Sequence, residues 1–216
     1  MIQKFQERQL VTAYLRVYSI LENAYRLAVE NNGTFEQWSG ATITTHEGGV
    51  KIRTDAKPEN VYDVMIKPYV TISNIQFQVK NHSNCMPDKS FHLDGSKETI
   101  ALHATKYTAL LPSGECVNIA WTTLADFYVD LNGKRKPNTL GKDQFVFSFD
   151  VDNPNRIKPG YNQMYWTDTP AYCDKNSAHG WIAGISCGFW ILRNHNMDYL
   201  HLPYEDIVKK WGGSGW

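Results

Sequence analysis

The chain has 216 residues, and 42% of them are hydrophobic, which is enough apolar material to fill a core. We expect a single domain, because domains most often run to about 100 to 150 residues and two full-sized cores need a longer chain. The 22 basic residues balance the 22 acidic residues, so no net positive field exists to attract nucleic acid, and we predict no nucleic-acid partner.

Residues 2–30 predict one long helix. They contain no Gly or Pro, and apolar side chains recur at spacings of three and four that line one helical face. These side chains are Val11, Tyr14, Tyr18, Leu21, Tyr25 and Ala28. Residues 31–33, Asn-Asn-Gly, provide a helix stop. Residues 3–9 are polar nearly all round, so we expect the first half of the helix to project from the domain or to continue a preceding segment.

The next elements are shorter. Residues 48–54 predict a strand, and Pro58 can open a second helix that Pro68 bends or ends. Residues 106–121 contain two β-favouring runs about the turn sequence PSGE, which predicts a hairpin. Two further strands are predicted in DFYVDL and QFVFSFDV, residues 126–131 and 144–151. A long helix followed by antiparallel strands predicts an α+β fold and not a βαβ alternation.

The last third of the chain is less regular. Residues 153–180 are rich in Pro, Asn, Gly and Tyr and predict a long irregular loop, whereas residues 181–194 are compatible with either strand or helix. We therefore divide the single domain into four consecutive parts. These are the helix at 1–32, a mixed helix and loop region at 33–105, the antiparallel sheet at 106–152 and a C-terminal region at 153–216.

Four cysteines, an even number without a C-x-x-C pair, argue against a zinc ribbon or a thioredoxin-type motif. Disulfides are favoured, with free thiols in a cytosolic protein as the alternative. A bond between Cys173 and Cys187 would close a loop of about 15 residues and stabilise the irregular segment by about 3 kcal/mol. Pairing of Cys85 with Cys116 then follows by elimination.

No apolar run approaches the 18 or so residues that a membrane span requires. Residue 1 lies directly before the predicted helix without a capping residue, so we expect the natural chain to begin upstream.

Several segments together resemble a known family. Residues 2–33, IQKFQERQLVTAYLRVYSILENAYRLAVENNG, resemble the exposed half of the long N-terminal helix of type IV pilin-like proteins, the pilins and the pseudopilins of type II secretion. LLPSGECVNIAW, VDLNGKRKPNTLGKDQFVF and SCGFWILRNHNMDYL follow in the order found in a bacterial branch defined by its prepilin-type cleavage and methylation segment. The family's leader peptide and its apolar stretch would precede residue 1.

The resemblance implies a spine helix packed on a small antiparallel sheet of about four strands, with a disulfide-closed region near the carboxyl end. It implies a non-enzymatic subunit of a pilus or of a type II secretion pseudopilus, at the cell surface or in the periplasm. The partners would be other pilin or pseudopilin subunits, in a homo- or hetero-polymer that serves adhesion, motility, DNA uptake or secretion. Membrane contact would come only through the N-terminal segment that precedes these residues.

The most specific motif is D-x-N-G-x-x-x-P-N-x-x-G-x-D at residues 130–143. Calcium takes six to eight oxygen ligands on a tightly folded loop, and a pseudopilin-like calcium site is the functional prediction that the resemblance adds here. The predicted ligands are Asp130, Asn132, Asn138 and Asp143. The alternative is a purely structural turn in which Asp143 braces the next strand, because residues 134–136, Lys-Arg-Lys, bring three positive charges toward any cation.

Two other functions are alternatives. One is a secreted module that binds glycan or protein through aromatic side chains, although core packing explains some of these equally well. These side chains are Tyr161, Tyr165, Trp166, Tyr172, Trp181 and Trp190. The other is a small serine hydrolase, because GISCG places Ser186 in a G-x-S-x-G motif with Asp198 and His201 following in hydrolase order. The antiparallel pattern and the short remainder of the chain argue against it.

Overall fold

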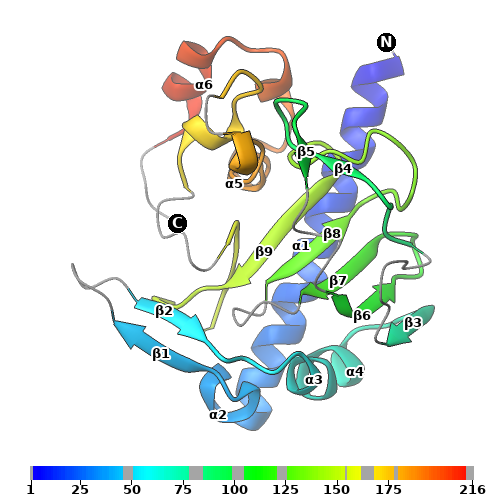
Figure 1. The fold of residues 1–216 in the computed structure, drawn as a ribbon, viewed down its shortest axis with the longest axis vertical. Helices are drawn as coiled ribbons and strands as arrows, with labels where there is room; N and C mark the ends of the chain where they lie inside the picture. The colour runs from blue at the N-terminus through cyan, green and yellow to red at the C-terminus, as the bar shows by residue number, and fades with distance from the viewer. Residues whose placement is uncertain are drawn as a thin grey trace.

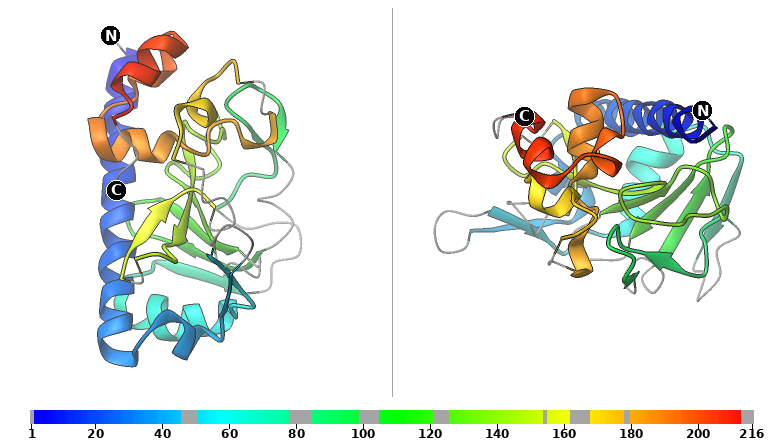
Figure 2. Two further views of the ribbon diagram at one scale, coloured as in Figure 1. Left: turned by 90° about the vertical axis from the view of Figure 1, so that its left-hand side faces the viewer. Right: turned by 90° about the horizontal axis from the view of Figure 1, so that it is seen from above.

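The longest element is α1 (Ile2–Asn32), a helix of 31 residues that runs along one side of the molecule (Figures 1 and 2). The computed structural model describes residues 2–45, 51–77, 85–98, 105–120, 126–153, 155–161, 168–177 and 180–212. The helix ends as predicted, since Gly33 has φ +85° and its N–H donates to the carbonyl of Val29.

A six-stranded antiparallel sheet packs on α1. Its order is β10-β9-β8-β7-β6-β3. The four central strands are those the sequence predicts, but two edge strands enlarge the expected sheet of about four. The bounds are β3 (Asn74–Phe77), β6 (Thr105–Leu110), β7 (Cys116–Ala120), β8 (Phe127–Asp130), β9 (Gln144–Phe149) and β10 (Ile157–Pro159). The predicted structureless loop at 153–180 is therefore wrong in part, because β10 pairs with β9 inside it.

Strand β9 is buried along its whole length and separates two apolar clusters. Phe145, Phe147 and Phe149 belong to the main core that includes α1, whereas Val146 belongs to a second cluster that includes Ile185. This division follows from the alternation of side chains along a strand. Strand β9 is thus the layer between the spine helix and the C-terminal region, a result that its near-continuous apolar sequence anticipates.

The face of α1 that meets the sheet carries tyrosines. Tyr14 contacts Phe145 edge to face, with ring centroids 4.6 Å apart, and Tyr25 contacts Phe149 at 4.7 Å. Both tyrosines are fully buried. Tyr18 of the predicted stripe is half-buried and donates its hydroxyl to the carbonyl of Ile157 on β10. The sequence-predicted apolar stripe is therefore the packing face of the helix.

The segment between α1 and the sheet forms short helices and two hairpins. Helix α2 (Phe35–Ser39) precedes the β1 (Thr42–Thr45) and β2 (Lys51–Thr54) ribbon, and β4 (Ser90–Phe91) pairs with β5 (Lys97–Glu98). The predicted second helix is a continuous helical segment made of α3 (Pro58–Val61), a π-helical stretch (Tyr62–Ile66) and α4 (Lys67–Tyr69). It ends one residue after Pro68. Strand β1 was not predicted, and residues 48–50 of the predicted strand lie outside the described residues.

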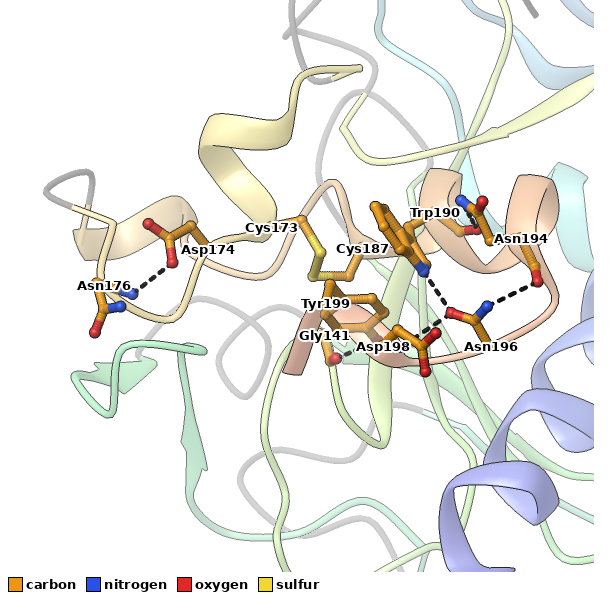
Figure 3. Close-up of a disulfide and its surroundings, with 10 residues drawn as sticks. All are labelled: Gly141, Cys173, Asp174, Asn176, Cys187, Trp190, Asn194, Asn196, Asp198 and Tyr199. Carbon is orange, nitrogen blue, oxygen red and sulfur yellow. Dashed lines mark hydrogen bonds between the residues drawn. A yellow bond between two sulfur atoms is a disulfide. The ribbon is translucent and has the colours of Figure 1, made fainter. Parts of the chain in front are cut away.

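The C-terminal region is mostly helical. Residues 181–194, whose sequence is compatible with either strand or helix, are helical. They lie in a 3-10 turn (Gly180–Ile182) and then in α5 (Cys187–Asn194), and α6 (Tyr204–Lys210) follows. Asn196 joins α5 to the 3-10 turn Asp198–Leu200, because its side-chain oxygen accepts from the indole of Trp190 at 2.8 Å and from the backbone of Asp198 at 3.0 Å (Figure 3).

Both predicted disulfides are present. Cys173 is bonded to Cys187 (Figure 3), and Cys85 is bonded to Cys116, so the free-thiol alternative is wrong. Disulfides persist in oxidising compartments, and the two bonds indicate an extracytoplasmic environment. Within the described parts of the chain, none of the helices combines the length and the apolar character that crossing a bilayer demands.

The buried face of α1 gives a direct stability test. Leu21 is fully buried, whereas Leu27 on the same helix is 36% exposed. We expect Leu21→Ala to lower the free energy of unfolding by about 2–5 kcal/mol through lost burial and the cavity that remains. Leu27→Ala makes the same chemical change and should cost less than about 1 kcal/mol. Urea unfolding of both variants measures the difference, and equal losses would contradict this packing.

Candidate functional site: a polar loop and an adjacent cleft

The D-x-N-G motif forms the connection between β8 and β9. Asp130 and Gln144 are register partners at the ends of the two strands, and the N–H of Leu131 donates to the carbonyl of Asp143 at 2.8 Å. The sheet thus closes the base of the loop. The structure brings all four predicted ligand residues together in this single connection.

Asp143 organises the far side of the loop. Its Oδ1 accepts the N–H of Thr139 at 2.7 Å, and its Oδ2 accepts the N–H of Asn138 at 2.9 Å and the side-chain amide of Asn132 at 3.0 Å. The Asp143 side chain is completely buried. Two backbone N–H groups that no strand partner could satisfy therefore depend on one carboxylate.

Asp130 has the same role at the start of the loop. Its Oδ1 accepts the N–H of Asn132 at 3.0 Å, its Oδ2 accepts the side-chain amide of Gln144 at 2.8 Å, and the N–H of Gly133 also donates to it. The pKa of Asp130 is raised to about 7, mainly by burial and in smaller part by the negative charge of Asp143, while the hydrogen bonds oppose the shift. Burial likewise raises the pKa of Asp143.

The second glycine of the motif joins the loop to the disulfide region. Gly141 has φ +79°, and a Cβ there would lie 2.8 Å from Cα of Gly184 and 3.0 Å from Sγ of Cys187. Its carbonyl accepts the hydroxyl of Tyr199 at 2.7 Å (Figure 3). A side chain at this position would separate the loop from the C-terminal region, which explains why glycine stands there.

The hydrogen bonds that the side-chain oxygens of the loop already accept bear on whether calcium could bind there. Each carboxylate already accepts three N–H groups. Within the described residues, the side-chain oxygens of Asn132 and Asn138 are buried and have no hydrogen-bond partner, and no cluster of three or more His, Cys, Asp or Glu could hold a metal. The carboxylates are therefore satisfied within the loop, as in a structural turn, whereas these two amide oxygens accept no hydrogen bond within the described residues. Calcium binding stays a prediction.

A cleft of about 420 Å³ lies beside the loop. The first half of α1 forms one wall, the turn between β6 and β7 another, and residues 131–137 the third. Arg16 of α1 makes an ion pair with Glu115, whose side chain is 1% exposed, and Ser113 also donates to Glu115. On the opposite wall, Nε of Arg135 donates to the carbonyl of Asn132 at 3.1 Å.

Comparison with known protein families assigns the chain to one of them. Residues 1–178 match a family described as "Family of unknown function (DUF6613)". The chain belongs to this family. The match spans α1, the sheet, the polar loop and the cleft, whereas α5 and α6 lie beyond it. Neither the curated proteins nor the solved structures contain a match.

The hydrolase motif lacks its required context. Ser186 is fully buried, and the residues before it form a 3-10 turn where the motif needs a strand of a parallel sheet. Nε2 of His201 lies 2.8 Å from Oε1 of Glu7 on α1. The GISCG sequence is therefore the entry into α5 and not a nucleophile elbow.

The predicted aromatic surface is also wrong in part. Trp190 is 1% exposed and Tyr161 is 7% exposed, so both belong to the core. Tyr172 is half-buried against the second apolar cluster. Tyr165, Trp166 and the side chain of Trp181 lie outside the described residues. A glycan-binding face cannot be built from the aromatic residues that the structure describes in this segment.

Sequence reasoning missed Gln144, Arg16 and Glu115 as members of the site. Gln144 begins a strand and carries no signal beyond its adjacency to Asp143. Arg16 and Glu115 are 99 residues apart, so no local spacing could join them. Only the packing of α1 on the sheet brings them together.

The raised pKa of Asp130 predicts a pH dependence. Between about pH 4 and pH 7 the unfolded chain loses the Asp130 proton while the folded chain keeps it, so the free energy of unfolding falls as pH rises and levels off above about 7. Asp130→Asn should remove up to about 4 kcal/mol of this fall, at about 1.4 kcal/mol per pH unit. Urea unfolding from pH 4 to 8 measures it, with the exposed Asp152→Asn as control. Parallel curves for wild type and Asp130→Asn would contradict the assignment.

A second measurement addresses calcium. If the predicted calcium site exists, the melting temperature should be higher in millimolar calcium than in chelator. A ligand that binds only the folded state would raise it by mass action. A rise of several degrees that Asp143→Asn abolishes would establish the calcium site, whereas equal melting temperatures would leave the purely structural turn.

Proposed function

We propose that the chain is a structural, non-enzymatic subunit of a type IV pilus or of a type II secretion pseudopilus. The observation that carries the proposal is a 31-residue helix whose buried face packs on an antiparallel sheet while its first turns extend past that sheet (Figure 1). Such a helix is about 46 Å long, far above the usual mean for globular domains. A rod of this length serves assembly better than it serves a small enclosed site.

The surface of the first turns supports contact with other chains. Ile2 is 77% exposed and Phe5 is 62% exposed, and both lie on α1. Buried residues of this helix begin only at Val11. Exposed apolar side chains on the first turns of the helix favour burial against another subunit.

The oxidising compartment that the disulfides indicate is compatible with a pilus or pseudopilus subunit. The two disulfides favour an extracytoplasmic location, and under this proposal that location is a cell-surface pilus or the periplasm. The partners are other pilin or pseudopilin subunits, as copies or as related chains. Membrane anchoring would use the N-terminal segment that precedes residue 1.

No specific observation favours a rival function. A glycan-binding module would need exposed aromatic residues where Tyr161 and Trp190 are buried. A serine hydrolase would need an accessible Ser186. The helix and sheet arrangement favours an assembly role over both.

The test uses the full-length protein in its native cells. Antibody against this domain should label fibres or periplasmic polymers in electron micrographs, and deletion of the assembly ATPase should leave only unassembled subunits. The gene upstream of residue 1 should encode a short basic leader ending in Gly and then an apolar stretch of about twenty residues. Recovery of the chain as a free secreted monomer, with or without the ATPase, would refute the proposal.

A further inference from the structure

The cleft beside the polar loop carries an excess of positive charge. Arg16, Arg135 and Lys136 line it, against the single carboxylate of Glu115. Glu115 is already paired with Arg16 inside the protein wall. Arg135 and Lys136 are exposed, and among the described residues no carboxylate pairs with either of them. Two unneutralised cations therefore face the cleft.

The loop itself explains why these two side chains have no carboxylate partner among the described residues. The carboxylates of Asp130 and Asp143 lie only a few residues away but take all their hydrogen bonds from N–H groups of the loop and of Gln144. Both are fully buried. The basic residues consequently cannot turn inward to pair with them, and their charge is presented at the surface.

The cleft continues onto an apolar strip of α1. Ile2, Phe5, Gln9 and Arg16 follow one another at helical spacings of three, four and seven residues, so they share one face of the helix. Gln9 and Arg16 line the cleft, while Ile2 and Phe5 lie toward the N-terminal end of the same face and are largely exposed. The combined surface is apolar at one end and cationic at the other. We call it the α1 cleft surface.

We propose that the α1 cleft surface binds an acidic amphipathic peptide segment of a neighbouring subunit. The carboxylates of such a segment would meet Arg135 and Lys136 in the cleft, because guanidinium and ammonium groups bind carboxylates by charge-assisted hydrogen bonds. Its apolar side chains would cover Ile2 and Phe5. The cleft volume lies within the range of about 300–1,000 Å³ typical of small binding sites. The inference rests on the proposed function only for the existence of a neighbouring subunit.

The experiment uses the purified chain and a defined probe. The probe is a fluorescein-labelled helical peptide with Leu on one face and Glu on the other, and fluorescence anisotropy reports binding. We expect the double variant Arg135→Glu with Lys136→Glu to bind it at least ten times more weakly than wild type. Phe5→Gln should weaken binding several-fold. A version of the peptide with Gln in place of every Glu should bind at least ten times more weakly to wild type.

The control separates a site from net charge. Lys4→Glu with Lys210→Glu makes the same change in net charge at two exposed positions, on another face of α1 and on α6, and should bind like wild type. Circular dichroism verifies that every variant is folded. The proposal is overturned if wild type does not bind the Glu peptide, if the two double variants are equally weakened, or if the Gln peptide binds as tightly. None of these results affects the polymer assay of the proposed function.

Discussion

The packing of α1 on β9 is the contact on which the other features depend. Tyr14 and Tyr25 of the helix meet Phe145 and Phe149 of the strand, and the opposite face of β9 supports the C-terminal region. A central strand that is buried on both faces is held firmly in place, so the segments attached to its ends have fixed positions relative to the helix. The polar loop begins β9, so the position of the loop against the first half of α1 is set by this same contact.

The polar loop is held rigid by its internal hydrogen bonds and by its contact with the C-terminal region. Asp143 holds the turn from within through two backbone N–H groups, and Gly141 lets the loop touch Gly184 next to the Cys173–Cys187 bond. The carboxylates are thus structural, at the cost of burying two acidic groups whose pKa values rise. The basic residues of the loop, at positions 134–136, remain exposed outside these hydrogen bonds.

Much of the fold follows from short-range pattern in the sequence. Helical spacing predicts α1, and strand alternation around PSGE predicts the β6 and β7 hairpin, because both depend on neighbours within a few residues. Strand β10 is only Ile157–Pro159, too short for a period, and it exists because β9 offers an open edge. The sequence alone does not show whether Trp190 lies at the surface or in the core. It is buried because α5 packs against the sheet.

The site is less predictable than the fold for a related reason. The motif at 130–143 indicates correctly that its four acidic and amide residues meet, since the spacing and the glycines determine a closed turn. Whether they meet around a cation or around N–H groups depends on donors that the motif does not contain, above all Gln144. The cleft depends on still longer range, because Arg16 and Glu115 come together only when α1 lies across the β6 and β7 turn. The cleft thus forms only in the folded chain, beside a loop that keeps Arg135 and Lys136 at the surface.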